Sequence, residues 1–285
     1  MEQRKPICEY ALTTPDASIE WGTEVLYVYL PTGEGYIRHQ VIHTVMAAIG
    51  ADTWRLGCVC HVDDTLSSPR PITSAGAEWE MAVKLQDRCD FIGGRAHGDE
   101  KFSSLTVTVD GVEKEMASLS EKTPFDELCV TVASTGYDPN EPDRAVLLHH
   151  KRLIFSAEML RVEQSVRFLT DEVPSCVYFG MMPPCKEYTD HFYTNINPEP
   201  REIPAVSGVF VQGKDADLKS VTLIGKEGYL YRMTAEKYNE AENSFIISDN
   251  RGNPYNKLYF PFSADAPVHA GDEWSTVTLY EIQYK

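Results

Sequence analysis

The most regular feature of the chain is an alternation of apolar and polar residues in short stretches. The alternation is cleanest over residues 127–135, and further strands are expected over 24–30, 54–62 and 78–85, with many valines and aromatic residues among them. Alternation with a period of two is typical of half-buried β-strands. Turn signals after residue 206 divide the rest of the chain into about five further strands.

Two β-hairpins give the strongest local signals. Asp110-Gly111 lies between two alternating runs over residues 104–116, and this dipeptide is typical of a type I′ turn. A longer strand pair is expected over residues 145–155 and 159–169. Many strands with almost no crossover helices predict antiparallel sheets packed face to face.

We therefore expect an all-β fold: a single large antiparallel β-sandwich of the jelly-roll or super-sandwich kind, with very little helix. The predicted domain covers residues 1–285, with an N-terminal arm over about 1–20. Residues 39–49 fit either a short helix or a strand, while 138–143 and 186–197 are expected to be loops.

The net charge of the chain argues against some classes of binding partner. The formal net charge is −17, which argues against nucleic acid or an anionic membrane as partner. No apolar run approaches the roughly 20 residues that span a bilayer. The N-terminal residues lack the apolar core of a secretory signal, so we expect a protein of the cytoplasm or of a particle such as a phage.

The seven cysteines have no regular spacing, so a disulfide framework is not expected. Cys58-Val59-Cys60-His61 resembles a metal motif. In a strand, however, the two thiols share one face and His61 takes the other. Since no second cysteine pair follows, we expect no metal at this motif.

The first candidate site is the glycine-rich segment 90–102. Glycines flank His97, and Asp99 and Glu100 follow directly. An imidazole and two carboxylates on such a segment can transfer protons or grip a polar ligand. A solvent-facing turn is the alternative. We expect no resident cofactor, with calcium on Asp99 and Glu100 as the open alternative.

The second candidate site is the run His149-His150-Lys151-Arg152, unusual in so acidic a chain. In a strand, His149 and Lys151 share one face, and His150 and Arg152 share the other. The run is either a solvated strand or a cationic strip that receives a carboxylate-bearing ligand.

The partner strand of this run carries Gln164 on its apolar side, where the amide needs a buried partner. Pairing across the turn puts Lys151 roughly opposite Glu163 or Arg161, and cross-strand salt bridging is the ordinary use of such a pattern. A third candidate site is the segment around Tyr188, which suits either sugar stacking or simple packing of its aromatic rings.

Together these groups predict a groove on one sheet face that takes an acidic polysaccharide. Cleavage by β-elimination needs a base for the proton α to a uronate carboxylate and a cation or amide to neutralise that carboxylate. Hydrolysis by two facing carboxylates, such as Glu100 with Glu163 or Asp190, is the alternative reaction. We expect catalytic roles for His97, His149, Lys151 and Tyr193. The base is His97 or His149, the acid is Tyr193 or Tyr178, and the group that neutralises the carboxylate is Lys151, Arg167 or Gln164. Substrate contacts are expected from Glu100, Arg152, Gln164, Arg167, Tyr178, Tyr188 and His191.

One order of motifs resembles a known group of proteins. Gly93-Gly94, His97-Gly98, a long hairpin and then an aromatic segment from Tyr178 to Pro183 resemble the super-sandwich of aldose-epimerase-like proteins. The second catalytic histidine of those proteins has no counterpart, because Tyr178 and Phe179 stand there. Jelly-roll polysaccharide lyases are similar in composition and in their long strands with His, Arg and Tyr.

The resemblance implies a carbohydrate-active β-sandwich, and a polysaccharide lyase is the enzyme class that we expect if the protein is an enzyme. A non-catalytic glycan-binding domain, or a structural or receptor-binding domain such as a phage tail component, is the alternative.

Overall fold

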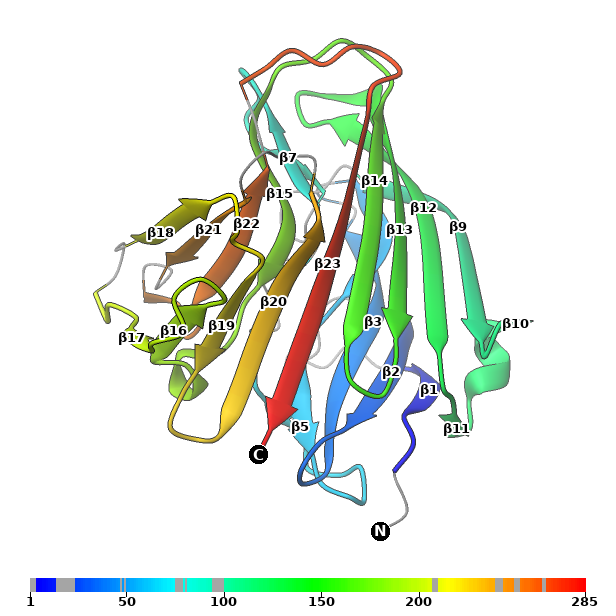
Figure 1. The fold of residues 1–285 in the computed structure, drawn as a ribbon. Helices are drawn as coiled ribbons and strands as arrows, with labels where there is room; N and C mark the ends of the chain where they lie inside the picture. Colours follow the sequence, from blue (N-terminus) through cyan, green and yellow to red (C-terminus); the bar gives the residue numbers. More distant parts are fainter. Residues whose placement is uncertain are drawn as a thin grey trace.

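The computed structural model describes residues 4–13, 24–46, 48, 50–74, 79, 81–93, 100–206, 210–238, 243–248, 252–262 and 265–285. Within these residues the fold is all-β, with two sheets and two 3-10 turns, η2 (Met116–Leu119) and η3 (Lys186–Tyr188) (Figure 1). No helix in the described part of the chain has the length and apolar character needed to span a bilayer. The predicted all-β sandwich is confirmed.

The larger sheet contains seventeen described strands. They are β1 (Ile7–Leu12), β2 (Glu24–Pro31), β3 (Tyr36–Met46), β4 (Ala51–Leu56), β5 (Cys60–Val62), β6 (Arg70–Pro71), β9 (Glu100–Val109), β10 (Val112–Lys114), β11 (Thr123–Pro124), β12 (Leu128–Asp138), β13 (Glu141–Phe155), β14 (Leu160–Phe168), β16 (His191–Thr194), β17 (Arg201–Glu202), β19 (Ser220–Ile224), β20 (Tyr229–Lys237) and β23 (Glu273–Tyr284).

Antiparallel pairing runs from β16 through β19, β20, β23, β14, β13 and β12 to β9. A single parallel contact, Asp52 opposite Lys101, then joins β9 to β4, and β3, β2 and β1 follow. The larger sheet thereby turns back on itself, so that β2 and β3 lie behind β13 and β14 (Figure 1).

The smaller sheet contains six described strands, in the order β8, β7, β15, β22, β21, β18 and antiparallel throughout. They are β7 (Ala82–Leu85), β8 (Phe91–Gly93), β15 (Pro174–Met182), β18 (Phe210–Asp215), β21 (Asn243–Ser248) and β22 (Lys257–Phe262).

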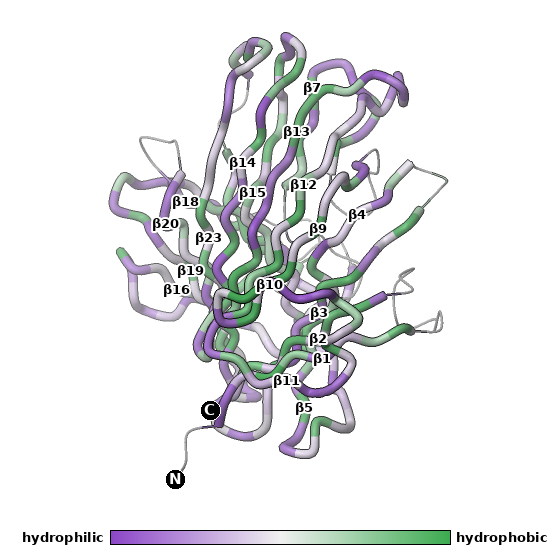
Figure 2. Tube along the Cα trace, turned by 90° about the vertical axis from the view of Figure 1, so that its right-hand side faces the viewer, coloured by the Kyte–Doolittle hydropathy of each residue, from purple (hydrophilic) through white to green (hydrophobic). Residues whose placement is uncertain are grey.

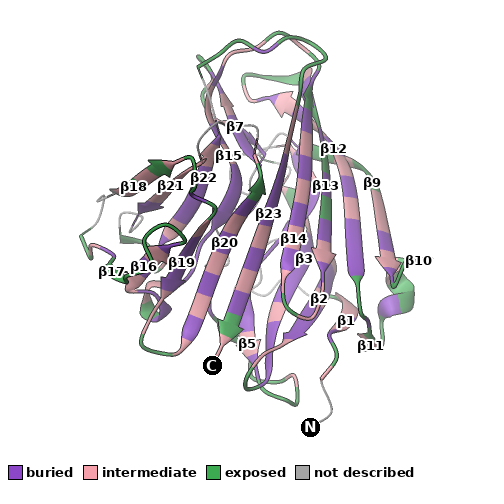
Figure 3. Cartoon of the chain, in the orientation of Figure 1, coloured by how far each residue is buried: buried purple, intermediate pink, exposed green. Residues whose placement is uncertain are grey.

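The main core lies between these layers. Val130, Leu153 and Val162 from the front strands pack in one cluster with Val28 of β2 and Leu258 of β22. Burial of each such side chain stabilises the fold by about 1.5–3 kcal/mol. Hydrophobic and hydrophilic positions follow one another along the strands (Figure 2), and buried positions alternate with more exposed ones along β12, β13 and β14 (Figure 3).

Both predicted hairpins are confirmed. Asp110 and Gly111 have φ of 50° and 77°, as a type I′ turn requires, and join β9 to β10. The long pair is β13 with β14. The ambiguous segment 39–49 falls largely in a strand, β3, because it pairs with β2 on one side and β4 on the other.

Two expectations about the N-terminal part were wrong. Residues 7–12 of the predicted arm form β1, which pairs with β2 along its whole length. The single strand expected over 54–62 is divided between β4 and β5. Gln40 holds this break, because its backbone oxygen accepts the N–H of Gly57 at 2.9 Å and its Oε1 accepts that of Cys58 at 3.0 Å.

Both predicted loops were also wrong. In 138–143, β12 extends to Asp138 and β13 begins only three residues later. The carboxylate of Asp138 pairs with Arg88 and Arg144 at 2.6 and 2.7 Å, which fixes this tight turn. In 186–197, η3 is followed by β16, which pairs with β19.

Candidate functional site

Four of the predicted site residues meet inside the sandwich. Glu100 begins β9, His149 and Lys151 lie on β13, and Gln164 lies opposite Lys151 on β14. Each is at most 4% exposed. The alternation of β13 explains this, since His149 and Lys151 point to the same side as the buried Leu153. The expected register was wrong by one residue, because Arg152, not Lys151, lies opposite Glu163.

We call this group the interior polar cluster: Glu100, Ser134, His149, Lys151 and Gln164. Hydrogen bonds connect four of its members, and the charge of Lys151 acts on Glu100. Glu100 Oε1 lies 2.9 Å from His149 Nδ1 and accepts the hydroxyl of Ser134. On the other side of the ring, His149 Nε2 lies 3.2 Å from Gln164 Oε1. The cluster thus forms a continuous chain from β9 to β14.

The orientation of Gln164 is set by the smaller sheet and its neighbourhood. Its Nε2 donates to the backbone oxygen of Phe179 at 2.9 Å, and its Oε1 accepts the backbone N–H of Met81 at 3.1 Å. These bonds satisfy the buried amide that the sequence placed on an apolar face. Because Oε1 faces His149, both ring nitrogens of that histidine lie next to acceptor oxygens.

Glu100 is held in its ionised form. Burial alone would raise its pKa, but the charge and hydrogen bond of His149, the charge of Lys151 and the hydroxyl of Ser134 together lower the pKa to about 2. The cluster therefore offers a carboxylate, an imidazole, an ammonium group and an amide within one small volume. Such a set can bind a carboxylate-bearing ligand and move a proton.

Other predicted residues of the long pair lie on the opposite, outer face. Arg152 is exposed and pairs with Glu163 at 2.6 Å, as cross-strand salt bridging predicts. Arg167 is also exposed, opposite Glu273 of β23. Glu163 and Glu100 therefore lie on different faces of the sheet.

The predicted aromatic and histidine contacts do not join the cluster. Tyr193 and His191 are on β16, which β19, β20 and β23 separate from β14. Tyr178 packs against Tyr259, with ring centroids 4.9 Å apart. Tyr188 is buried against Tyr229 at 5.0 Å.

The predicted base His97 lies outside the described residues, as does Asp99. Their predicted roles, with calcium as the alternative ligand, stay predictions. Among the described residues no group of three or more His, Cys, Asp or Glu side chains is arranged to hold a metal ion.

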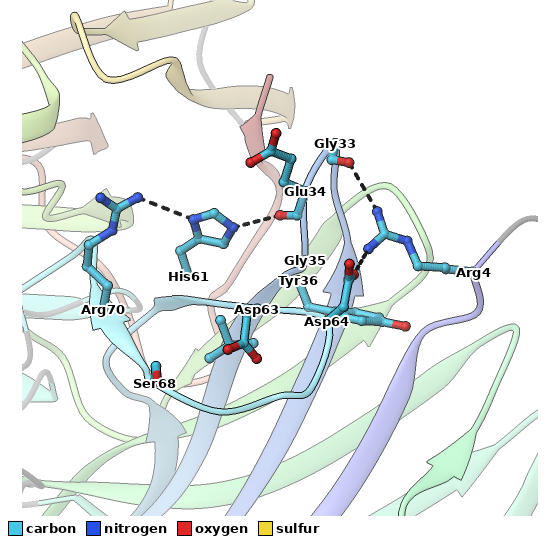
Figure 4. A pocket seen from close by; sticks show the side chains of 11 residues that line it. Arg4, Gly33, Glu34, Gly35, Tyr36, His61, Asp63, Asp64, Ser68 and Arg70 are labelled. Atoms are coloured by element: carbon cyan, nitrogen blue, oxygen red, sulfur yellow. Dashed lines mark hydrogen bonds and ion pairs between the residues drawn. The ribbon is translucent and has the colours of Figure 1, made fainter.

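The sequence did not reveal an open pocket at the end of the sandwich where the β2–β3 turn meets β5 and β6. We call it the end pocket, and its volume is about 830 Å³. Arg70 and His61 form one side of it, and Arg4 with Asp64 stands on the other (Figure 4). Glu34 lies between them on the turn.

One earlier observation did point toward this pocket. The thiols of Cys58 and Cys60 lie 3.8 Å apart on one side of their segment, while His61 bonds to Tyr229 on the other, as the strand pattern predicts. The residue that accompanies His61, Arg70, carries no local signal, because strand pairing alone brings it opposite His61.

No protein-family model matches the sequence, and neither does any curated protein. Solved structures do match it. A variant of the GH36 α-galactosidase AgaA from Geobacillus stearothermophilus, in complex with raffinose, is 8% identical with a TM-score of 0.50, over 90% of this chain and 40% of that one. The chain thus spans about two fifths of the length of that enzyme.

Two further matches have lower TM-scores. A putative aldose 1-epimerase from Escherichia coli K12 is 12% identical with a TM-score of 0.45, over 92% of this chain and 100% of that one. Heparan sulfate lyase HepC from Pedobacter heparinus is 8% identical with a TM-score of 0.49, over 95% and 36%. The resemblance to carbohydrate-active β-sandwich proteins is confirmed as a likeness of fold.

Proposed function

We propose that this protein is carbohydrate-active and that the interior polar cluster acts on an acidic polysaccharide. The observation that carries the proposal is the convergence of Glu100, His149, Lys151 and Gln164 from three strands. Buried ion pairs contribute little to stability compared with apolar residues of similar size, so folding alone gives weak reason for them. Perturbed, clustered titratable groups are typical of functional sites. An α-galactosidase of this fold that holds raffinose supports a sugar as the ligand class.

The proposed reaction is β-elimination at a uronate. A base removes the proton α to the carboxylate, the electron pair forms a C=C bond, the glycosidic C–O bond breaks, and an acid protonates the leaving oxygen. His149 serves as the acid, with Glu100 orienting its ring and stabilising its charge. Lys151 neutralises the uronate carboxylate as charge moves onto it. His97 remains the predicted base.

A glycan can reach the interior polar cluster only if the covering layer of the protein moves. His149 and Lys151 are each 1% exposed, and Met81 and Phe179 of the opposite layer lie against Gln164. The covering layer must therefore move when a glycan chain enters. Sequestration of the reacting groups from water strengthens their electrostatic interactions once the site has closed again.

The test is a panel of uronate polymers, with the near-ultraviolet absorbance of the unsaturated product as readout. We expect product with the wild type and with His150→Gln, a matched control on the outer face of the same strand. His149→Gln and Lys151→Met should lose about a hundredfold or more in rate. Unchanged rates in these two variants, or no product from any polymer, would contradict the proposed reaction.

Glycan binding away from the interior polar cluster, without catalysis, is the second candidate function, because the side chains of the cluster are closed off from solvent. In that case uronate oligosaccharides bind the wild type and His149→Gln with the same affinity, and no absorbance develops. Calorimetric titration of both proteins with the same oligosaccharides separates the two functions.

A further inference from the structure

Arg70 is held in place by its neighbours in the end pocket. Its guanidinium lies over the rings of Tyr229 and Tyr188, at 5.3 and 5.6 Å from their centroids. The same group donates from Nη2 to the hydroxyl of Tyr229 and lies 3.4 Å from His61 Nδ1. Stacking and hydrogen bonding together fix a side chain that is otherwise exposed.

A chain of hydrogen bonds fixes the partners of Arg70 in turn. His61 Nε2 donates to the backbone oxygen of Glu34 at 2.7 Å, and its Nδ1 lies 2.8 Å from the hydroxyl oxygen of Tyr229. Burial raises the pKa of Tyr229 to about 12, which keeps its proton available for that bond. The ring of Tyr284 packs 4.6 Å from His61 and closes the group from behind.

The guanidinium keeps donors for a ligand. Its hydrogen bonds to described residues all leave from Nη2, and among those residues no carboxylate pairs with it. No described residue accepts a hydrogen bond from its Nε or Nη1, so these N–H groups remain able to donate to the carboxylate of a ligand. By contrast, Arg4 across the pocket is already paired with Asp64 and bonded to the turn, with Gly33 O at 3.2 Å.

The acidic residues of the pocket limit the charge of that ligand. Asp63 is occupied by its own turn, where it accepts from Thr65 and Ser67. Glu34 and the paired Asp64 remain as acceptors for hydroxyl groups, and with a net charge of −17 they disfavour ligands with several negative charges. The surroundings fit one carboxylate next to several hydroxyls.

We infer that the end pocket is a binding site for a sugar acid, a monosaccharide unit with one carboxylate, which Arg70 anchors and His61 and Tyr229 position. This site goes beyond the proposed function, because no residue of the interior polar cluster lines it. On a uronate polymer, the end pocket would bind one sugar unit, and the bond that the interior polar cluster cleaves would lie elsewhere along the polymer.

The probes are galacturonate and glucuronate, compared with glucose, acetate and inorganic sulfate at constant ionic strength. Binding is followed by NMR through the ring signals of His61 and Tyr284 in the full chain. We expect saturable shifts with the two sugar acids and weaker binding of glucose, acetate and sulfate, since each lacks the hydroxyls or the single carboxylate.

Arg70→Gln should weaken sugar-acid binding about tenfold or more, since a charge-assisted pair is lost. Arg70→Lys keeps the positive charge but loses the planar guanidinium that stacks on Tyr229 and Tyr188, so its affinity should lie between those of the wild type and Arg70→Gln. Tyr229→Phe should also weaken binding, because it frees both Arg70 and His61. The matched control is Arg201→Gln, which removes an exposed arginine of β17 and should bind as the wild type does.

Three results would overturn this site: equal affinity for glucose and glucuronate, tighter binding of sulfate than of either sugar acid, or unchanged affinity in Arg70→Gln with its melting temperature preserved. Failure of the proposed reaction would be seen differently, as missing product with the shifts of His61 and Tyr284 intact. His149→Gln should leave those shifts unchanged.

Discussion

At the scale of single residues, Glu100 shows how the fold changes the chemistry of a side chain. Its carboxylate is buried and yet ionised, because His149, Lys151 and Ser134 surround it with positive charge and donors. The sequence named Glu100 as a ligand contact from its place after a glycine-rich turn. It gave no sign of Ser134, a small polar residue on the inner face of a strand otherwise rich in valine.

The lowered pKa of Glu100 predicts a specific acid sensitivity. The folded-state pKa is about 2 against an ordinary value of 4.5, so the ionised form stabilises the fold fully above about pH 4.5. This contribution is lost as the pH falls towards 2, and it amounts to the order of 3 kcal/mol. Urea unfolding of the wild type and Glu100→Gln at pH 7, 4 and 2.5 should show that the difference between their unfolding free energies becomes smaller as the pH falls. A constant difference would contradict it.

At the scale of elements, β13 shows which part of a pattern can be read from sequence. Alternation placed His149 and Lys151 on one face and Arg152 on the other, and the structure has them so. The pattern could not tell which face is buried, because both carry apolar and cationic residues. Contacts with β2 of the larger sheet and β22 of the smaller sheet decide which face is buried. The residues that make these contacts are far away in the sequence.

This assignment of faces predicts opposite outcomes for two leucines of β13. Leu153 is 0% exposed and Leu148 is 42% exposed. Leu153→Ala should cost about 2–5 kcal/mol of unfolding free energy, because it leaves a cavity in the main core. Leu148→Ala should change it by about 0.5 kcal/mol or less. Chemical denaturation measures both, and similar losses in the two variants would refute the assignment.

At the scale of the whole molecule, the all-β class and most strands follow from the sequence, while the arrangement of the layers does not. The single contact of Asp52 with Lys101 turns the larger sheet, and nothing local marks it. The end pocket was missed for the same reason, since His61 and Arg70 meet only through the pairing of β5 and β6.

The two layers are also joined by a buried hydroxyl. Tyr280 of β23 donates to the backbone oxygen of Trp79 at 2.9 Å and accepts the N–H of Met181 at 3.2 Å. Tyr280→Phe keeps the volume but leaves these two groups without this partner, so we expect a loss of about 1–3 kcal/mol. Tyr137→Phe is the control, since its ring takes part in a contact with Lys101 that needs no hydroxyl. Denaturant midpoints that coincide for the two variants would show that the hydroxyl of Tyr280 does not hold the layers.

The way the larger sheet terminates has a consequence for how the molecule behaves in a crowded solution. Among the described strands its borders include β10, three residues long, and β6, β11 and β17, each two residues long; the last three contain Arg70-Pro71, Thr123-Pro124 and Arg201-Glu202. Proline withholds an amide, and charged side chains resist a dehydrated approach, so a foreign strand finds almost no backbone there to extend. These short borders of the larger sheet thereby offer little template for growth, sheet by sheet, into a fibre.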